Sequence, residues 1–414
     1  MTTLTRARAG FGTLPGWARS AIVVAVGVGL LAVTATLTGQ IQLTSSGTTQ
    51  AAVRLLLPIL FAALGGLWAE RAGVINIGLE GMMILGTWGA AWAGYQWGPY
   101  AAVVGGLVFG VLGGLLHAVA TVSFGVNHIV SGVAITLLGL GVTKYLSTLL
   151  FLPVSGNPRQ SPRVEGFETF SVQPLADALA AVEAQQRVVL SDVAGLLGGL
   201  LSGLTPLVVL GFVLVPASYL LLWRTSFGLR LRSCGENPVA AESLGVQVYL
   251  YKYIALIVSG ALAGLGGAAL TLNPGQLGYL EGQTGGRGYI GLAAMIFGNW
   301  RPGGLLAGSA LFGYVDGVQL RAGGEAVHAL LYGASILAVG LAVLWVLQRR
   351  WQTAAIALVA GAAVYAVYFS TETVPREFAS YAPQIVTLLV LAVASQRLRP
   401  PAAIGMEYRR GEGD

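Results

Sequence analysis

Cysteine is nearly absent from this sequence, in which Cys234 is the only thiol among 414 residues. One thiol cannot form a disulfide within its own chain, and it cannot build a cysteine-based metal site. The three histidines, at positions 117, 128 and 328, do not have the spacing of metal ligands. We therefore expect neither a disulfide framework nor a metal site.

Charged residues are also scarce: they make up 10% of the chain, whereas soluble domains carry about a quarter. Only two lysines occur, and there is no G-x-x-x-x-G-K-[ST] loop of the kind that holds ATP phosphates. No pairing of a nucleophile with a base stands out either. The sequence therefore predicts a protein that is not an enzyme and that uses no cofactor of its own.

Apolar sequence takes the place of these missing residue types. Hydrophobic residues make up 55% of the chain, and its 60 glycines favour close packing of helices in lipid. These values predict an all-α integral membrane protein in the lipid bilayer, built as a single transmembrane domain over 1–414. In a membrane protein the basic residues behind the net charge of +6 set the orientation of the chain in the bilayer. The charge therefore does not indicate a nucleic-acid partner. Within an expected bundle of about 10–12 helices, the candidate spans are 21–39, 51–68, 76–95, 100–122, 126–152, 204–223, 249–272, 287–299, 303–320, 326–347, 353–369 and 381–396.

The basic residues predict the orientation of the chain. If the N-terminus is cytoplasmic and each segment crosses once, most of the 23 Lys and Arg fall on cytoplasmic stretches. The long loop at about 153–203 is then external, while the loop at about 224–248 and the C-terminus are cytoplasmic. Glu70 and Arg71 are expected to form a solvated pair at the cytoplasmic rim. The segment 287–299 is too short to span and is expected to be half of a broken helix.

Two short stretches resemble one another: IGLEGMM at 77–83 and IGLAAMI at 290–296. In the topology above they run in opposite directions, which is typical of an inverted repeat whose interface carries the solute. A match this short also arises by chance in an apolar background, so both interpretations stay open.

Glu80 is an acid inside an apolar span, where an unpaired charge is costly. One interpretation places Glu80 on the solute route, together with Asn76 one helical turn earlier. The other makes Glu80 an anchor at a helix end, bonded to exposed backbone near Gly78 and Gly81. The sequence does not decide between them.

Three further residues are candidates for the solute pathway. Asn127 opens the fifth span beside His128 and could line the inner end of the path, although a surface His at a helix start is the more frequent case. Gly288 and Tyr289 lie in a glycine-rich region, where irregular backbone is tolerated only in a cavity or within packed protein. Tyr289 could stack on a ring of the solute, whereas Trp300 is better explained as an interfacial anchor.

The polar stretch 225–246 predicts a short helix, because it contains residues that favour a helix start and residues that favour a helix end. Asn237 is a good N-cap, Pro238 suits the first turn, and Gly245 fits the stop. Such a helix at the membrane surface is shaped to dock into a groove of another protein. The alternative is a solvated loop that contacts nothing. The face expected to dock consists of Val239, Ala240, Ala241 and Leu244.

Three stretches resemble a known family: ERAGVINIGLEGMM at 70–83, GLRLRSCGENPVAAESLGV at 228–246, and GGRGYIGLAAMIFGNWRPGG at 285–304. With the ending RLRPPAAIGMEYRRGE at 397–412, they are similar to permease subunits of ATP-binding-cassette (ABC) importers. This broad group serves simple sugars, branched-chain amino acids and nucleosides, and the ending is similar to that of nucleoside-type members. The resemblance covers most of 50–320 and the extreme C-terminus.

The resemblance implies partners and a mechanism. ATP would be used by a separate pair of ABC ATPase subunits, with a second permease, expected to be homologous but not identical, and an external solute-binding protein completing the importer. ATPase closure would push the helix in 225–246 and switch the permeases between outward- and inward-facing states. The residues that would take this coupling role are Gly235, Glu236, Asn237, Ala240, Ala241 and Gly245.

The sequence departs from the family pattern in two places. Family members are nearer ten spans, whereas 326–369 contains an added or rearranged pair, and the loop 153–203 is long. The main hypothesis is a nucleoside permease, with simple sugars or branched-chain amino acids as the alternatives within the same kind of importer. An ion-coupled secondary transporter would instead need buried ion-site carboxylates and no docking helix.

Overall fold

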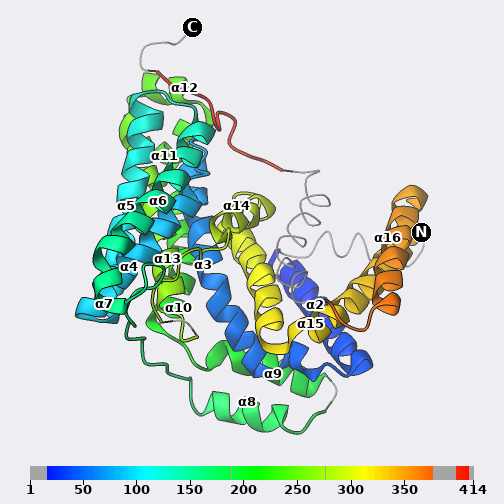
Figure 1. The fold of residues 1–414 in the computed structure, drawn as a ribbon. Helices are drawn as coiled ribbons and strands as arrows, with labels where there is room; N and C mark the ends of the chain where they lie inside the picture. Colours follow the sequence, from blue (N-terminus) through cyan, green and yellow to red (C-terminus); the bar gives the residue numbers. More distant parts are fainter. Residues whose placement is uncertain (1–15, 188, 276, 376–397, 410–414) are drawn as a thin grey trace. The chain divides into compact units, whose positions relative to one another are not determined.

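The structure is a computed structural model that describes residues 16–187, 189–275, 277–375 and 398–409 (Figure 1). Its contacts divide the chain into two compact units, each with a buried core of its own. Unit 1 consists of Met1–Ala52, Phe170–Gly203 and Tyr314–Pro383, and unit 2 of Val53–Thr169, Leu204–Gly313 and Gln384–Asp414. The assignment of 1–414 to a single transmembrane domain stays a prediction.

Unit 2 contains most of the long apolar helices and the polar segment between two of them. Its elements are α3 (Ser46–Arg71) from residue 53 onward, α4 (Leu79–Trp97), α5 (Pro99–Ala118) with a π-helical turn (Val119–Ser123), α6 (His128–Leu150), α7 (Leu152–Ser155), α10 (Pro206–Arg224), α11 (Ser226–Glu236), α12 (Pro238–Ser243), α13 (Val248–Thr271), α14 (Arg287–Phe297) and the start of α15 (Pro302–Leu347).

Proline marks the beginning of several of these helices. Pro99, Pro206 and Pro238 each occupy the first turn of their helix, where the missing N–H costs no hydrogen bond. Thr205 also caps α10, because its hydroxyl accepts a hydrogen bond from the Val208 N–H. Pro99 and Pro206 thus begin two of the long apolar helices, and Pro238 begins the short helix α12.

Glycines bring α5 and α13 into backbone contact in the core of unit 2. A Cβ atom at Gly110 would overlap the carbonyl oxygen of Gly260, and one at Gly264 would overlap that of Gly106. Gly114 makes the same kind of approach to the α13 backbone. The small-residue spacing thus produces close helix packing.

Unit 1 contains α2 (Gly16–Thr38), a 3-10 turn (Ile41–Thr44), α8 (Leu175–Glu183), α9 (Leu190–Leu201), the rest of α15 and α16 (Trp351–Ser370). Tyr314 Oη donates a hydrogen bond to the Leu43 carbonyl at 2.6 Å, which ties α15 to the turn after α2. Gly323 has φ of 66°, so α15 is two helices joined at a kink. The kink lies between the two predicted segments 303–320 and 326–347.

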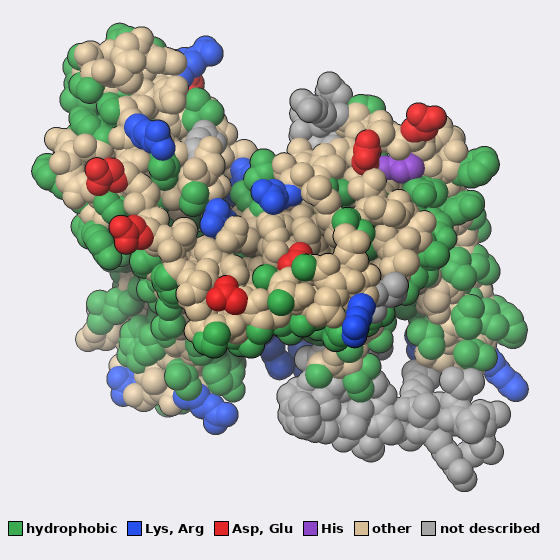
Figure 2. All heavy atoms as spheres, turned by 90° about the horizontal axis from the view of Figure 1, so that it is seen from below, with side chains coloured by type: hydrophobic (Ala, Val, Ile, Leu, Met, Phe, Trp, Pro, Cys, Tyr) green, Lys and Arg blue, Asp and Glu red, His purple; other side chains and the backbone are tan. Residues whose placement is uncertain are grey.

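The described residues bear out the all-α prediction: they form helices and no strand. Seven of their helices are long and apolar enough to cross a membrane. Each predicted span from 21–39 to 353–369 coincides with a helix, and 381–396 lies outside the described residues. Charged side chains are few on the face drawn in Figure 2, as expected from the composition. The protein is a multi-pass membrane protein.

Candidate functional site

Two breaks in helical structure meet near Glu80. Residues 72–78 are non-helical, with Gly73 at φ 86°, and they lead from α3 into α4. Gly285 and Gly286 also have positive φ, and α14 starts directly after them. α14 has 11 residues, so it is half a span, as predicted for 287–299.

Glu80 joins these two breaks. Its carboxylate oxygens accept hydrogen bonds from the backbone N–H groups of Gly286 at 3.0 Å and Gly288 at 2.7 Å. Glu80 therefore anchors a helix end, which is one of the two predicted roles, but the end belongs to α14 and not to the backbone at Gly78 and Gly81. A Cβ at Gly288 would lie 2.6 Å from the Glu80 backbone, so only glycine permits this approach.

Asn76 is fully buried in the non-helical stretch, and its Nδ2 donates to Ser259 Oγ at 2.8 Å. Because α4 begins only at Leu79, the expected placement of Asn76 one helical turn from Glu80 is wrong. The buried Oδ1 of Asn76 has no hydrogen-bond partner among the described residues. Such an atom is a place where water or solute can bind.

Asn127 has a structural role as the N-cap of α6, where its Oδ1 accepts from Ile129 N and Val130 N. His128 is not the surface histidine that the alternative assumed. It is 4% exposed, and its Nδ1 accepts from the Ile75 N–H at 3.3 Å. The start of α6 therefore holds the non-helical stretch 72–78 in place.

Tyr289 follows Gly288 and is 42% exposed on this chain. Trp300, expected to be an interfacial anchor, is instead buried, and its Nε1 donates to the Glu70 carboxylate at 2.5 Å. Arg71 donates to the Trp300 carbonyl oxygen through Nε and Nη2. Glu70 and Arg71 are thus both bound to Trp300 and do not form the solvated pair that was predicted.

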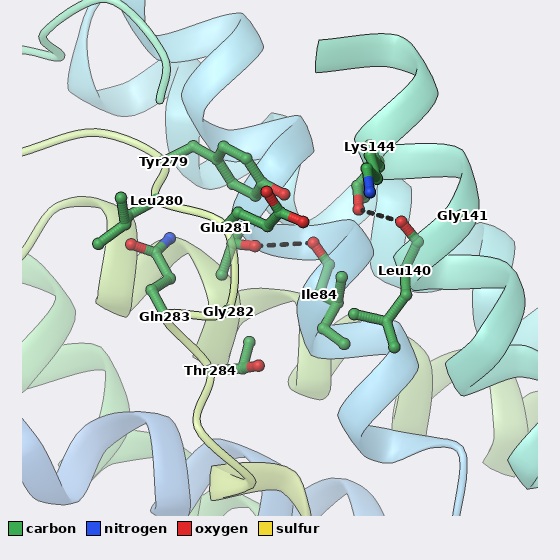
Figure 3. Close-up of a pocket in the computed structure, with 12 residues that line it drawn as sticks. Ile84, Leu140, Gly141, Lys144, Tyr279, Leu280, Glu281, Gly282, Gln283 and Thr284 are labelled. Atoms are coloured by element: carbon green, nitrogen blue, oxygen red, sulfur yellow. Dashed lines mark hydrogen bonds between the residues drawn. The ribbon is translucent and has the colours of Figure 1, made fainter. Parts of the chain in front are cut away.

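A cavity of about 340 Å³ opens between α4, α6 and the loop before α14 (Figure 3). Hydroxyl groups of Thr87, Thr143 and Thr284 contribute to its wall, together with Gln283. Gln283 Nε2 donates to Thr271 Oγ1 at 3.4 Å, whereas its buried Oε1 has no partner among the described residues. The charged side chains of Lys144 and Glu281 also line the cavity, so its mainly apolar wall carries charged as well as neutral hydrogen-bonding groups.

None of the five residues predicted for the solute pathway lines this cavity. The structure brings Glu80 and Gly288 together, places Asn76 in the preceding non-helical stretch, and puts Asn127 at another helix start. Six of the twelve lining residues form the short run YLEGQT at 279–284, and the other six lie on α4 and α6. That run was the available sequence signal.

The polar segment 225–246 forms two short helices. Asn237 caps α12 by accepting from Ala240 N at 3.0 Å, and Gly245 ends it at φ 80°. Leu244 is 85% exposed and Val239 44% exposed, so an apolar face points away from the chain. Ala241, expected on that face, is instead buried against Cys234 and Val248.

The inner side of this segment packs on the C-terminal residues. Ala403 N donates to the Gly235 carbonyl at 2.9 Å, and Ala402 N donates to Glu236 Oε2 at 3.1 Å. Tyr408 Oη donates to the Glu242 carboxylate. Gly235 and Glu236 therefore hold the segment against the tail, while Val239 and Leu244 remain available for a partner.

Residues 47–340 match the family described as the branched-chain amino acid transport system / permease component. The chain belongs to this permease family. It is therefore a membrane-spanning permease subunit of an ABC transporter and not an enzyme. No solved structure matches it.

Several curated proteins are similar to the chain. The guanosine ABC transporter permease protein NupQ of Bacillus subtilis is 33% identical over 64% of this chain and 78% of its own length. The nucleoside permease NupC of Lactococcus lactis is 31% identical over 64% and 80%. TsgC13 of Haloferax volcanii, named as a candidate glucose ABC transporter permease, is 34% identical over 67% and 78%.

The same two bacteria contain a second similar permease. NupP of Bacillus subtilis is 26% identical to this chain, and NupB of Lactococcus lactis is 22% identical. Each of these two bacteria thus has two permeases that are similar to this chain.

Proposed function

We propose that this chain is one of two non-identical permease subunits of an ABC importer that carries nucleosides into the cytoplasm. A pair of ATPase subunits binds the segment 225–246 on the cytoplasmic side, and a solute-binding protein delivers nucleoside from outside. The N-terminus and the C-terminal tail are cytoplasmic in this arrangement.

The exposed face of α12 carries the proposal. α12 has six residues, so it cannot span a membrane, and it lies in a polar segment next to the arginine-bearing α11. The Leu244 side chain, 85% exposed, and Val239 therefore point apolar surface into a polar environment. Apolar contacts with a groove on a partner remove that surface from water.

The Glu80 contact supports an uncharged solute. The amino end of a half-helix in a membrane carries partial positive charge and attracts anionic groups of a solute. In α14 this end is occupied by the Glu80 carboxylate, which accepts from Gly286 and Gly288. A solute carboxylate, such as that of an amino acid, would find these donors taken, which favours nucleosides and sugars.

The cavity beside α6 supports a small polar solute. Its volume of about 340 Å³ is at the lower end of the range for small-molecule sites. Its wall offers threonine hydroxyls and the unpartnered oxygen of Gln283, and these suit hydroxyl and amino groups. We assign it to the solute path, with Asn76, Glu80 and Gly288 as its structural support and Tyr289 on the exposed side of α14.

The permease pairs support a non-identical partner. This chain is 33% identical to NupQ and 26% identical to NupP, and 31% identical to NupC and 22% to NupB. It is thus more similar to NupQ and NupC than to NupP and NupB. The second permease of the importer would then be a different chain that corresponds to NupP or NupB.

The test is ATP-driven uptake of labelled guanosine and adenosine by the complete importer in proteoliposomes. We expect uptake that needs ATP and the ATPase subunits. Leu244→Asp should lower it by at least about tenfold, because a charge in a desolvated contact disrupts binding. Val154→Asp, at a 62% exposed position outside the segment 225–246, is the matched control and should retain uptake.

The outcomes separate the hypotheses. Uptake of nucleosides without any ATPase would contradict the importer and favour an ion-coupled carrier. ATP-driven uptake of glucose without nucleosides would keep the importer and replace the solute, as the similarity to TsgC13 suggests. Full uptake by Leu244→Asp would show that α12 does not couple the subunits.

A further inference from the structure

A second cavity, of about 310 Å³, opens where the ends of α3, α10 and α14 meet the C-terminal tail. Six residues that line it are Arg71, Trp223, Glu236, Asn299, Arg301 and Arg399. All of them lie in unit 2. Three arginines therefore converge on one cavity that contains a single carboxylate.

Arg71 is held firmly in the wall of this cavity. Two of its guanidinium nitrogens donate to the Trp300 carbonyl oxygen, at 2.7 and 3.2 Å. Its guanidinium also lies 5.2 Å from the centre of the Trp223 ring, over which Arg232 is placed as well. The remaining nitrogen, Nη1, has only a loose contact of 3.9 Å with Glu236.

The charges of Arg301 and Arg399 are not balanced within the described chain. Both side chains are exposed, and the described residues contain no ion pair to either of them. Glu236 is 54% exposed and shares its charge with Arg71 and the tail amide of Ala402. The cavity thus has an excess of positive charge.

The surrounding backbone fixes this arrangement. Asn299 and Trp300 both have φ of 52°, a left-handed conformation that non-glycine residues rarely adopt. This turn directs the Trp300 carbonyl to Arg71, and it lets Asn299 Oδ1 accept from Arg399 N at 2.8 Å. Two of the three arginines are therefore positioned by the same turn.

We propose that this cavity binds the phosphate group of an anionic ligand, of which the headgroup of an acidic phospholipid is the chief source. Guanidinium groups match the oxygens of phosphate in geometry and charge. Basic pockets between membrane helices on the cytoplasmic side are suited to such headgroups. Trp223 and the ends of the apolar helices α3 and α10 place the cavity where the chain leaves the membrane.

A bound phosphate would act on the coupling segment directly. It would neutralise Arg301 and Arg399 in the cavity that Glu236 also lines, and Glu236 on α11 accepts a hydrogen bond from the tail amide of Ala402. The proposal rests on the proposed function only for the cytoplasmic orientation of this end. Its consequence is an importer whose ATPase activity depends on acidic lipid.

The test compares the complete importer with Arg301→Gln/Arg399→Gln. Retained phosphatidylglycerol is measured by native mass spectrometry, after purification from vesicles containing equal parts of phosphatidylcholine and phosphatidylglycerol. We expect bound lipid on the natural chain and about tenfold weaker retention for each arginine lost. The matched control Arg224→Gln/Arg230→Gln removes two exposed arginines that do not line the cavity, and it should retain the lipid.

Inorganic phosphate distinguishes the sources of the ligand. If phosphate raises the melting temperature of the natural complex but not of the cavity variant, and no lipid is retained, the site takes soluble phosphate. If neither lipid nor phosphate distinguishes the cavity variant from the control, the proposal is wrong. These readouts need no transport, so they stand even if nucleoside uptake fails.

Discussion

Glu80 on α4 accepts a hydrogen bond from the backbone N–H of Gly288 on α14 at 2.7 Å, across 208 positions of sequence. The other carboxylate oxygen binds the Gly286 N–H. An acid buried in an apolar span thus closes the amino end of a half-helix, and both breaks in helical structure depend on it.

Replacing Glu80 should loosen this junction. Glu80→Ala leaves the buried N–H of Gly288 and the partly buried N–H of Gly286 without their acceptors, and it should cost about 2–4 kcal/mol of stability. Glu80→Gln retains one acceptor oxygen and should cost less. The measurement is the melting temperature of the purified complex, with uptake as a second readout.

An unchanged melting temperature in Glu80→Ala would contradict the structural role. Glu325→Ala is the control, because Glu325 is exposed and, among the described residues, its side chain accepts a hydrogen bond only from Gln40 Nε2, at 3.3 Å. The stability of that variant should lie within about 0.5 kcal/mol of that of the natural chain, so its melting temperature should be nearly unchanged.

Gly235 sits where α11 touches the end of α3. A Cβ at this position would overlap the Arg71 carbonyl oxygen and lie 2.9 Å from Gly73 N. Gly235→Ala should therefore displace α11 and reduce ATP-driven uptake while the permease still enters the membrane. Gly303→Ala is the control, since a Cβ there meets nothing within 4 Å. Equal uptake by the two variants would show that α11 can shift without consequence.

The only thiol of the chain reports on the same packing. Cys234 is fully buried, and burial raises the pKa of its thiol to about 11. At pH 8 about one thiol in a thousand is then ionised, so maleimide labelling should be slow. Because the pKa is raised, the rate should increase about tenfold per pH unit from pH 7 to 9 without levelling off.

An exposed cysteine in α12 provides the comparison. Ser243→Cys, made together with Cys234→Ala, places a thiol on the exposed side of the same segment. Its labelling should be fast and should begin to level off near pH 9. Rapid labelling of Cys234 at pH 7 would mean that α11 and α12 separate from the rest of unit 2.

Local signals predicted much of this fold. Apolar runs located the helices, Asn237 and Gly245 marked the ends of α12, and the shortness of 287–299 indicated a half-helix. Long-range contacts could not be predicted in the same way. Nothing near Glu80 indicates that its partners are Gly286 and Gly288, more than 200 positions away.

The direction of single side chains was also beyond the sequence. Ala240 and Ala241 are adjacent and identical in type, yet Ala240 is exposed and Ala241 is buried against Cys234. Which of them faces inward depends on how α12 lies on α13 and the tail. Likewise, Trp300 fits an interfacial anchor by sequence, but it lies in the turn after α14 and its partner Glu70 lies on α3.

The cavity beside α6 provides the last prediction. Gly141 lines this cavity, and a Cβ at Gly141 would meet nothing within 4 Å. Gly141→Phe should therefore place its ring in the open space without forcing the helices apart. We expect nucleoside uptake to fall by about tenfold or more, because a filled site excludes the solute, while ATPase activity and complex assembly remain.

Gly340→Phe is the matched control, since Gly340 on α15 also has open space around it and is not among the residues that line the cavity. Its uptake should equal that of the natural chain. If Gly141→Phe transports guanosine at the normal rate, the solute passes elsewhere, and the exposed face of α14 at Tyr289 becomes the next candidate. If both variants lose uptake together with assembly, the added ring disturbs helix packing, and the smaller change Thr143→Val tests the cavity by removing one hydroxyl.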